Sequence, residues 1–191
     1  MEIKELKNPC TMEYVELKKL FQGFNFPWFY NLTTTPGPEG RVYLGEDYPF
    51  YSHTIMERPN KNPGFEKPYS TITSDHFKPT FLILQQIFSH NKLDVEVVYR
   101  ISLNVTFAVP AISFKKSNYH TDLNIPHQNM IIYLSKFEGG ELYIKDDTEE
   151  IEITPQEDDI ISFDGDLQHC AAPPVGIERR MIMVVNFLCH Q

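Results

Sequence analysis

Two segments near the N-terminus carry apolar residues at the spacing of one helix face. In the first, these residues follow Thr11, a residue type that caps helices, and they recur at Tyr14, Leu17, Leu20 and Phe21. In the second, Pro79 suits a first helical turn, and Phe81, Leu84, Ile87 and Phe88 come after it. The spacing predicts two amphipathic helices, and the second should end at residues 89–91.

The stretch between these helices, residues 23–75, is dense in proline and aromatic residues. Proline fixes its own φ angle and disfavours a helical conformation in the residue before it, so an irregular stretch with short strands is predicted. Aromatic residues such as Trp28 and Tyr48 argue against disorder. Long irregular stretches within compact domains are usually functional, and we expect a lid or binding loops here.

After residue 95 the pattern changes to short runs of β-branched and apolar residues. These runs cover residues 96–109, 130–134, 141–145, 150–153, 159–163 and 181–188, and turn-forming residues separate them. Several short strands without intervening helices predict an antiparallel sandwich or barrel. We therefore expect one mainly β domain over residues 1–191. Residues 1–95 would form its helices and loops, and residues 96–191 its β core.

Composition narrows the classes of function. A chain of 191 residues that is 41% hydrophobic suits one folded domain, and its formal net charge of −9 argues against a partner such as nucleic acid. Three widely spaced cysteines do not form a disulfide framework. The N-terminus does not read as a signal peptide, and no apolar run has transmembrane length. The sequence predicts a soluble, cytoplasmic protein without a membrane partner.

The segment from His120 to Asp122 and the later His169 carry candidate metal ligands. Residues two apart in an extended segment point to the same side, so His120 and Asp122 can share one ion. His169 follows a predicted strand and turn that could return the chain to them. Two imidazoles and one carboxylate suit iron(II) and leave coordination positions open. Zinc could bind the same residues with water as a fourth ligand, and the ligand types alone do not separate the two metals.

Other polar residues are candidates for the surroundings of the metal. Arg179 and Arg180 begin the last predicted strand; only one can face inward to hold an acidic co-substrate, and the strand period does not decide which. Tyr133 is either a core aromatic residue or a hydroxyl donor. Asn104 either contacts a co-substrate or has a structural role. His127 is a rival metal ligand, which we expect to line the pocket or the surface instead.

Residues from about 99 to 188 resemble the 2-oxoglutarate and iron(II)-dependent oxygenases, above all the prolyl-hydroxylase-like branch with its small phage-encoded members. The resemblance rests on the joint order and spacing of short motifs: Arg100-Ile-Ser-Leu-Asn104, Tyr119-His120-Thr121-Asp122, Ile132-Tyr133-Leu134-Ser135, Gly139-Gly140-Glu141-Leu142, Ile161-Ser162-Phe163-Asp164-Gly165, His169 and Arg180. Residues 1–95 carry no motif that identifies a substrate.

The resemblance implies a double-stranded β-helix, the jelly-roll or cupin-like core, in which His120, Asp122 and His169 bind iron(II). It also implies that an arginine of the last strand pairs with the distal carboxylate of 2-oxoglutarate. Alignment of that strand by its end favours Arg180, with Arg179 in reserve. Tyr133 matches a family tyrosine that donates a hydrogen bond to the same carboxylate.

The implied activity is that of a dioxygenase that consumes O2 and 2-oxoglutarate, forms succinate and hydroxylates a C–H bond. Its substrate would be an unidentified protein or peptide, for example one hydroxylated at a proline, or a small molecule; fold-level analogy does not choose between them. Two alternatives stay open. One is a non-catalytic cupin-like module that binds a metal or a small acid. The other is a zinc hydrolase with the same ligands, which leaves the paired arginines unexplained.

Overall fold

The computed structural model describes residues 2–32, 48–59, 69–109 and 116–190. Its largest element is an antiparallel sheet in the order β1-β10-β6-β13-β5-β3-β2, with β4 paired to β3. Its strands are β1 (Ile3–Leu6), β2 (Phe29–Asn31), β3 (Phe50–Glu57), β4 (Thr71–Ile72), β5 (Val95–Thr106), β6 (Gln128–Tyr133), β10 (Ile160–Asp164) and β13 (Arg180–Cys189).

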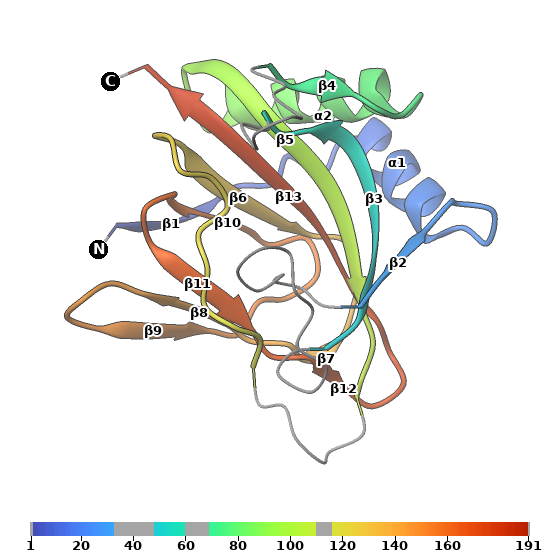
Figure 1. Cartoon of the computed structure of the whole chain (residues 1–191). Helices are drawn as coiled ribbons and strands as arrows, with labels where there is room; N and C mark the ends of the chain where they lie inside the picture. The colour runs from blue at the N-terminus through green and yellow to red at the C-terminus, as the bar shows by residue number, and fades with distance from the viewer. Residues whose placement is uncertain (1, 33–47, 60–68, 110–115, 191) are drawn as a thin grey trace, which may run out of the picture.

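Two smaller antiparallel sheets complete the β core. One has the order β11-β8-β9 and the other pairs β12 with β7. Their strands are β7 (Glu138–Gly139), β8 (Leu142–Lys145), β9 (Glu150–Ile153), β11 (Gln168–Ala171) and β12 (Pro174–Val175). Figure 1 shows the β8, β9 and β11 sheet lying across from the large sheet. These facing antiparallel sheets form the predicted double-stranded β-helix.

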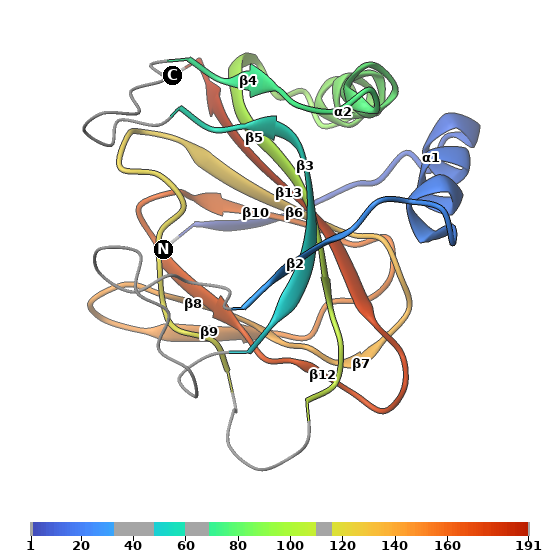
Figure 2. The ribbon, with the colours of Figure 1, turned by 45° about the vertical axis from the view of Figure 1, so that its right-hand side comes forward.

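The two helices, α1 (Met12–Gln22) and α2 (Phe77–His90), confirm the helical periodicity of the sequence. Thr11 caps α1 by accepting a hydrogen bond from the Tyr14 backbone N–H at 3.3 Å. Both helices lie on the side of the large sheet that faces away from the smaller sheets (Figure 2). Their buried faces pack with outward-facing sheet residues in one cluster that includes Phe21, Leu84, Leu103 and Met183. None of the described helices is long and apolar enough to cross a membrane.

Alternation along the central strands decides which side chains point between the sheets. On β13, Met181, Met183, Val185 and Phe187 belong to the cluster beneath the helices. The intervening residues Ile182 and Val184 pack in a second cluster that includes Ile144 of the smaller sheet. Since side chains alternate along a strand, Arg180 and Asn186 share the inner face with this second cluster. The large sheet therefore presents two polar side chains to its interior along β13, at its first residue and at Asn186.

The prediction for residues 23–75 was incomplete. This stretch contains β3, an eight-residue strand that pairs with β5 inside the large sheet. The strands β1 and β11 were also not predicted from the sequence. Residues 33–47 and 60–68, which carry much of the predicted lid, lie outside the described residues.

Candidate metal centre and active site

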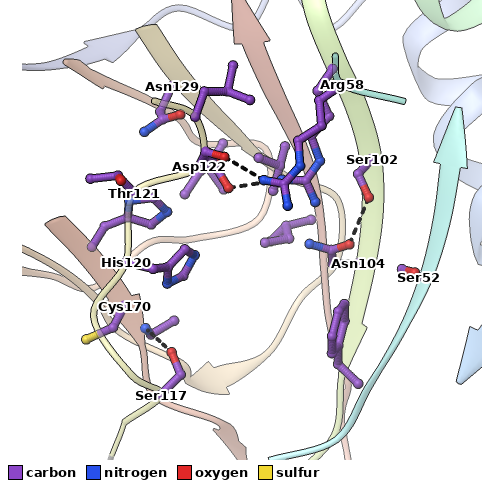
Figure 3. Close-up of a pocket in the computed structure, with 18 of the residues that line it drawn as sticks. Ser52, Arg58, Ser102, Asn104, Ser117, His120, Thr121, Asp122, Asn129 and Cys170 are labelled. Carbon is purple, nitrogen blue, oxygen red and sulfur yellow. Dashed lines mark hydrogen bonds and ion pairs between the residues drawn. The ribbon is translucent and has the colours of Figure 1, made fainter. Parts of the chain in front are cut away.

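A cavity of about 850 Å³ lies between the sheets. Its walls come from the inner faces of β3, β5, β6 and β13, from the segment around His120 and from β11. Ligand pockets in proteins are commonly about 300–1,000 Å³, so the cavity has room for a co-substrate and a further molecule. Figure 3 shows that polar side chains from several of these elements point into it.

The structure brings the three predicted metal ligands together in this cavity. One candidate ligand atom from each of His120, Asp122 and His169 lies within 4.8 Å of the others. The two histidines form a β-bridge: the His120 N–H donates to the His169 carbonyl at 3.1 Å, and the His169 N–H donates back at 2.9 Å. The backbone of the second segment thus places His169 beside the first ligand pair.

The Asp122 carboxylate is buried and oriented through both of its oxygens. Arg100 Nη1 donates to Oδ1 at 3.0 Å, and Asn186 Nδ2 donates to Oδ2 at 2.9 Å. Burial alone would raise the pKa of Asp122, but the Arg100 charge, the two histidines once they are protonated at low pH, and the Asn186 hydrogen bond hold it well below its usual range. The carboxylate is therefore ionised at neutral pH, as a metal ligand must be.

His169 is 7% exposed and has the protonation state that metal binding requires. Burial lowers the pKa of its imidazole to about 4, although the Asp122 carboxylate acts in the opposite direction. At neutral pH the ring is uncharged, so a nitrogen lone pair is available to a metal. An ionised carboxylate beside a neutral buried imidazole fits the mixed nitrogen and oxygen set that iron(II) accepts.

Arg179 and Arg180 lie on opposite sides of the large sheet. Arg180 is 5% exposed and lines the cavity, where Nη1 donates to the Gly140 carbonyl at 3.0 Å and the Ala172 carbonyl at 3.3 Å. Its Nε is buried without a hydrogen-bond partner among the described residues. Arg179 instead donates to the Gln22 carbonyl at the end of α1, at 2.9 Å. Of the two candidates, Arg180 is the one that lines the cavity.

Tyr133 and Asn104 also line the cavity. Burial raises the pKa of the Tyr133 hydroxyl, and the nearby Arg180 charge offsets only part of this shift, so the hydroxyl remains a donor at neutral pH. The Asn104 Oδ1 accepts a hydrogen bond from Ser102 Oγ at 3.1 Å, which orients the amide as Figure 3 shows. Both residues are placed to contact a bound molecule.

His127 lies neither at the cavity nor at the surface, where we expected it. It is buried at 3% exposure, it is absent from the cavity lining, and its Nδ1 lies 2.8 Å from the Ile125 carbonyl oxygen. A Cβ on Gly165 would lie 2.3 Å from the imidazole, so the ring packs where only glycine leaves space. The expectation that His127 lines the pocket or the surface was therefore wrong, and it is not part of the metal-binding group.

Three residues beside these candidates were not singled out from the sequence. Ser135 Oγ donates to the Arg179 carbonyl at 2.8 Å and accepts from the Met181 N–H at 2.9 Å, so it fixes the backbone on both sides of Arg180. Arg58 lines the cavity and donates to the Asp122 backbone carbonyl. Asn186 orients the carboxylate of the candidate metal ligand Asp122. The sequence signal for Ser135 was its position in the motif Ile132-Tyr133-Leu134-Ser135, two residues after Tyr133.

Comparison with solved structures agrees with the fold. A 2OG-Fe(II) oxygenase family oxidoreductase from Burkholderia pseudomallei matches with a TM-score of 0.69 and 14% identity, over 99% of this chain and 86% of that one. A prolyl hydroxylase from Trichoplax adhaerens, in complex with a hypoxia inducible factor peptide fragment, matches with a TM-score of 0.59 and 12% identity. That match covers 97% of this chain and 83% of the other. The non-heme alpha-ketoglutarate-dependent epimerase SnoN from nogalamycin biosynthesis matches with a TM-score of 0.61 and 8% identity. That match covers 97% of this chain and 77% of the other.

At these identities the match establishes the fold, which is that of 2OG-Fe(II) oxygenases, including prolyl hydroxylases. The sequence matches no protein-family profile and no curated protein. The three similar structures include different reactions, a hydroxylation and an epimerisation. Activity therefore has to be argued from the residues of this cavity.

Replacing Asn186 with alanine tests the support of Asp122. The variant loses the hydrogen bond to Oδ2, so Arg100 is the carboxylate's remaining donor among the described residues, and the carboxylate can rotate away from the ligand position. We expect iron(II) affinity to fall about ten- to hundredfold, as removal of partners of metal ligands usually causes. Metal titration of the folded variant measures this, with Asn31→Ala, also on the cavity wall, as the control. Unchanged iron affinity in Asn186→Ala would contradict the assignment.

Proposed function

We propose that the protein is an iron(II)- and 2-oxoglutarate-dependent dioxygenase that hydroxylates a C–H bond of a peptidyl or small-molecule substrate. The observation that carries the proposal is the grouping of His120, Asp122 and His169 within 4.8 Å in a cavity that Arg180 also lines. The double-stranded β-helix and the motif resemblance support it.

The residues present fit the groups that this activity needs. His120, Asp122 and His169 would hold iron(II), because the carboxylate is ionised and the buried His169 is neutral. Bound iron supplies the activation of O2, which no protein side chain provides. Arg180 would hold the distal carboxylate of 2-oxoglutarate, since its buried Nε has no acceptor among the described residues. The Tyr133 hydroxyl would donate to the same carboxylate.

The protein contributes orientation and exclusion of water in the reaction. The balanced conversion is 2-oxoglutarate, O2 and R–H to succinate, CO2 and R–OH. Ile131, Ile182 and Val184 line the cavity with apolar surface, which limits water in that part of the site. Arg180 and Tyr133 would fix one end of 2-oxoglutarate so that its 2-oxo acid end reaches the metal ligands. A peptidyl substrate has the support of the similarity to a peptide-bound prolyl hydroxylase.

An anaerobic titration with iron(II) and 2-oxoglutarate tests the proposal. We expect a visible charge-transfer band when 2-oxoglutarate chelates the iron, and decay of that band with formation of succinate when O2 is admitted. Folded, iron-loaded protein without the band would contradict the proposal and favour a metal-binding module. Hydrolytic activity that needs zinc and no 2-oxoglutarate would favour the hydrolase alternative.

A further inference from the structure

Two further arginines, Arg58 and Arg100, line the cavity away from Arg180. Arg100 pairs with Asn186 across β5 and β13, whereas Arg180 pairs with Thr106. Six residues along an extended strand span roughly 20 Å, so Arg100 lies near the opposite end of the inner face from the proposed 2-oxoglutarate arginine. Arg58 follows β3 and lines the same part of the wall.

Both guanidinium groups converge on Asp122. Arg100 Nη1 donates to the carboxylate at 3.0 Å, and Arg58 Nη1 donates to the backbone carbonyl of the same residue. Figure 3 shows the Arg58 side chain reaching toward Asp122 from the opposite wall. A guanidinium has five N–H donors, and each of these bonds uses one of them. Among the described residues, the pair therefore keeps further donors in a rigid fork that matches a carboxylate or phosphate.

The described lining of the loaded site carries a net positive charge. Among the described residues, the cavity lining carries three arginines, Arg58, Arg100 and Arg180, against two carboxylates, Glu57 and Asp122. This leaves one positive charge. Iron(II) adds two positive charges and 2-oxoglutarate adds two negative ones, so one positive charge remains with both bound. A positive pocket in a chain of net charge −9 attracts and orients anions locally.

The wall between β3 and β5 is polar where it faces the cavity. Ser52 and Thr54 of β3 lie opposite Asn104 and Ser102 of β5, and all four side chains line the cavity. Figure 3 shows Ser52, Ser102 and Asn104 across the cavity from His120 and Asp122. Hydroxyl and amide groups in a partly enclosed site need hydrogen-bond partners. Such a wall suits a substrate with polar groups along its length.

We propose that the prime substrate is a polar molecule with a carboxylate or phosphate group, and that Arg58 and Arg100 bind this anion. The inference rests on the proposed dioxygenase function and specifies its substrate class. Anchoring the anion beside Asp122 places the rest of the molecule along the polar row and next to the metal ligands. Arg58 and Arg100 then determine substrate specificity, and Arg180 remains the residue for 2-oxoglutarate.

Calorimetric titration of anion probes tests this assignment. The protein is saturated with iron(II) and 2-oxoglutarate under argon, and inorganic phosphate and acetate are then titrated separately. We expect one of the two to bind, and Arg58→Gln to weaken it about tenfold or more, because a charge-assisted hydrogen bond is lost. Arg179→Gln removes the same charge outside the cavity and should bind the probe like the wild type. The preferred probe separates a phosphate-bearing from a carboxylate-bearing substrate.

The outcomes separate this inference from the proposed function. The charge-transfer band is recorded for each protein before the anion is added, and its absence from the wild type would count against the dioxygenase proposal alone. A normal band combined with no anion binding, or with equal binding by wild type and Arg58→Gln, would overturn the substrate assignment. Equal losses in Arg58→Gln and Arg179→Gln would also overturn it, because they would report net charge rather than a site.

Discussion

Arg180→Ala is expected to weaken 2-oxoglutarate binding by about a hundredfold or more. The side chain is buried on the inner face of β13, and its Nε has no acceptor within the described chain, so a bound carboxylate would receive a charge-assisted hydrogen bond there. Loss of both the charge and the fork geometry removes the only arginine at this end of the described cavity wall.

The matched control is its neighbour. Arg179→Ala removes the same charge one residue away, but that side chain contacts the end of α1 and not the cavity, so 2-oxoglutarate affinity should stay within about twofold. Titration of 2-oxoglutarate against each iron-loaded protein under argon measures both. Arg180→Lys should fall between wild type and Arg180→Ala because lysine keeps the charge without the fork. A reversed order of the two alanine variants would assign the role to Arg179.

The sequence left open which of Arg179 and Arg180 faces the cavity. Strand alternation established that only one of them could face inward, but not which one. The structure settles the orientation through Ser135, whose hydroxyl bonds the backbone at Arg179 and Met181 and so fixes the start of β13. Ser135 lies 44 positions from Arg179 and 46 from Met181 in the sequence, so no local pattern encodes these contacts.

Elements with strong local signals were predicted well. Helix α1 carries both its apolar period and its own cap at Thr11, and α2 carries its apolar face, so neither depends on distant residues for its identification. β1 and β3 lack such signals. β1 is a short strand at the end of the sheet order that forms by pairing with β10, and β3 lies within a proline-rich stretch. Their formation depends on partners supplied by the rest of the fold.

In the candidate metal site, too, locally visible residues were predicted and residues that depend on distant contacts were not. His120, Asp122 and His169 were predicted by ligand type, spacing and resemblance, and the structure brings them together. The residues that orient Asp122 were not predicted, because Arg100 and Asn186 lie 22 and 64 positions away in the sequence. The ligand types are visible locally, whereas the hydrogen bonds that hold them depend on which strands become neighbours.

His169→Ala is expected to abolish iron binding and reduce succinate formation by at least about a hundredfold. The imidazole is buried and neutral, and its backbone bridge to His120 does not depend on the side chain. Removal therefore leaves the backbone arrangement intact but only two ligands, too few for a stable iron site. We expect a cooperative unfolding transition close to that of the metal-free wild type, and no charge-transfer band.

The control is His90→Ala, which removes an exposed histidine at the end of α2 and should keep full iron binding. Added imidazole can enter the space left in His169→Ala, so partial return of the band would show that the missing group is the ligand itself. Turnover at wild-type level by His169→Ala would reject the three-residue assignment. If His169→Ala lost both turnover and folding, the result would not separate a ligand role from a role in the scaffold. The imidazole experiment separates the two roles, because added imidazole restores the band only when the missing group is a ligand.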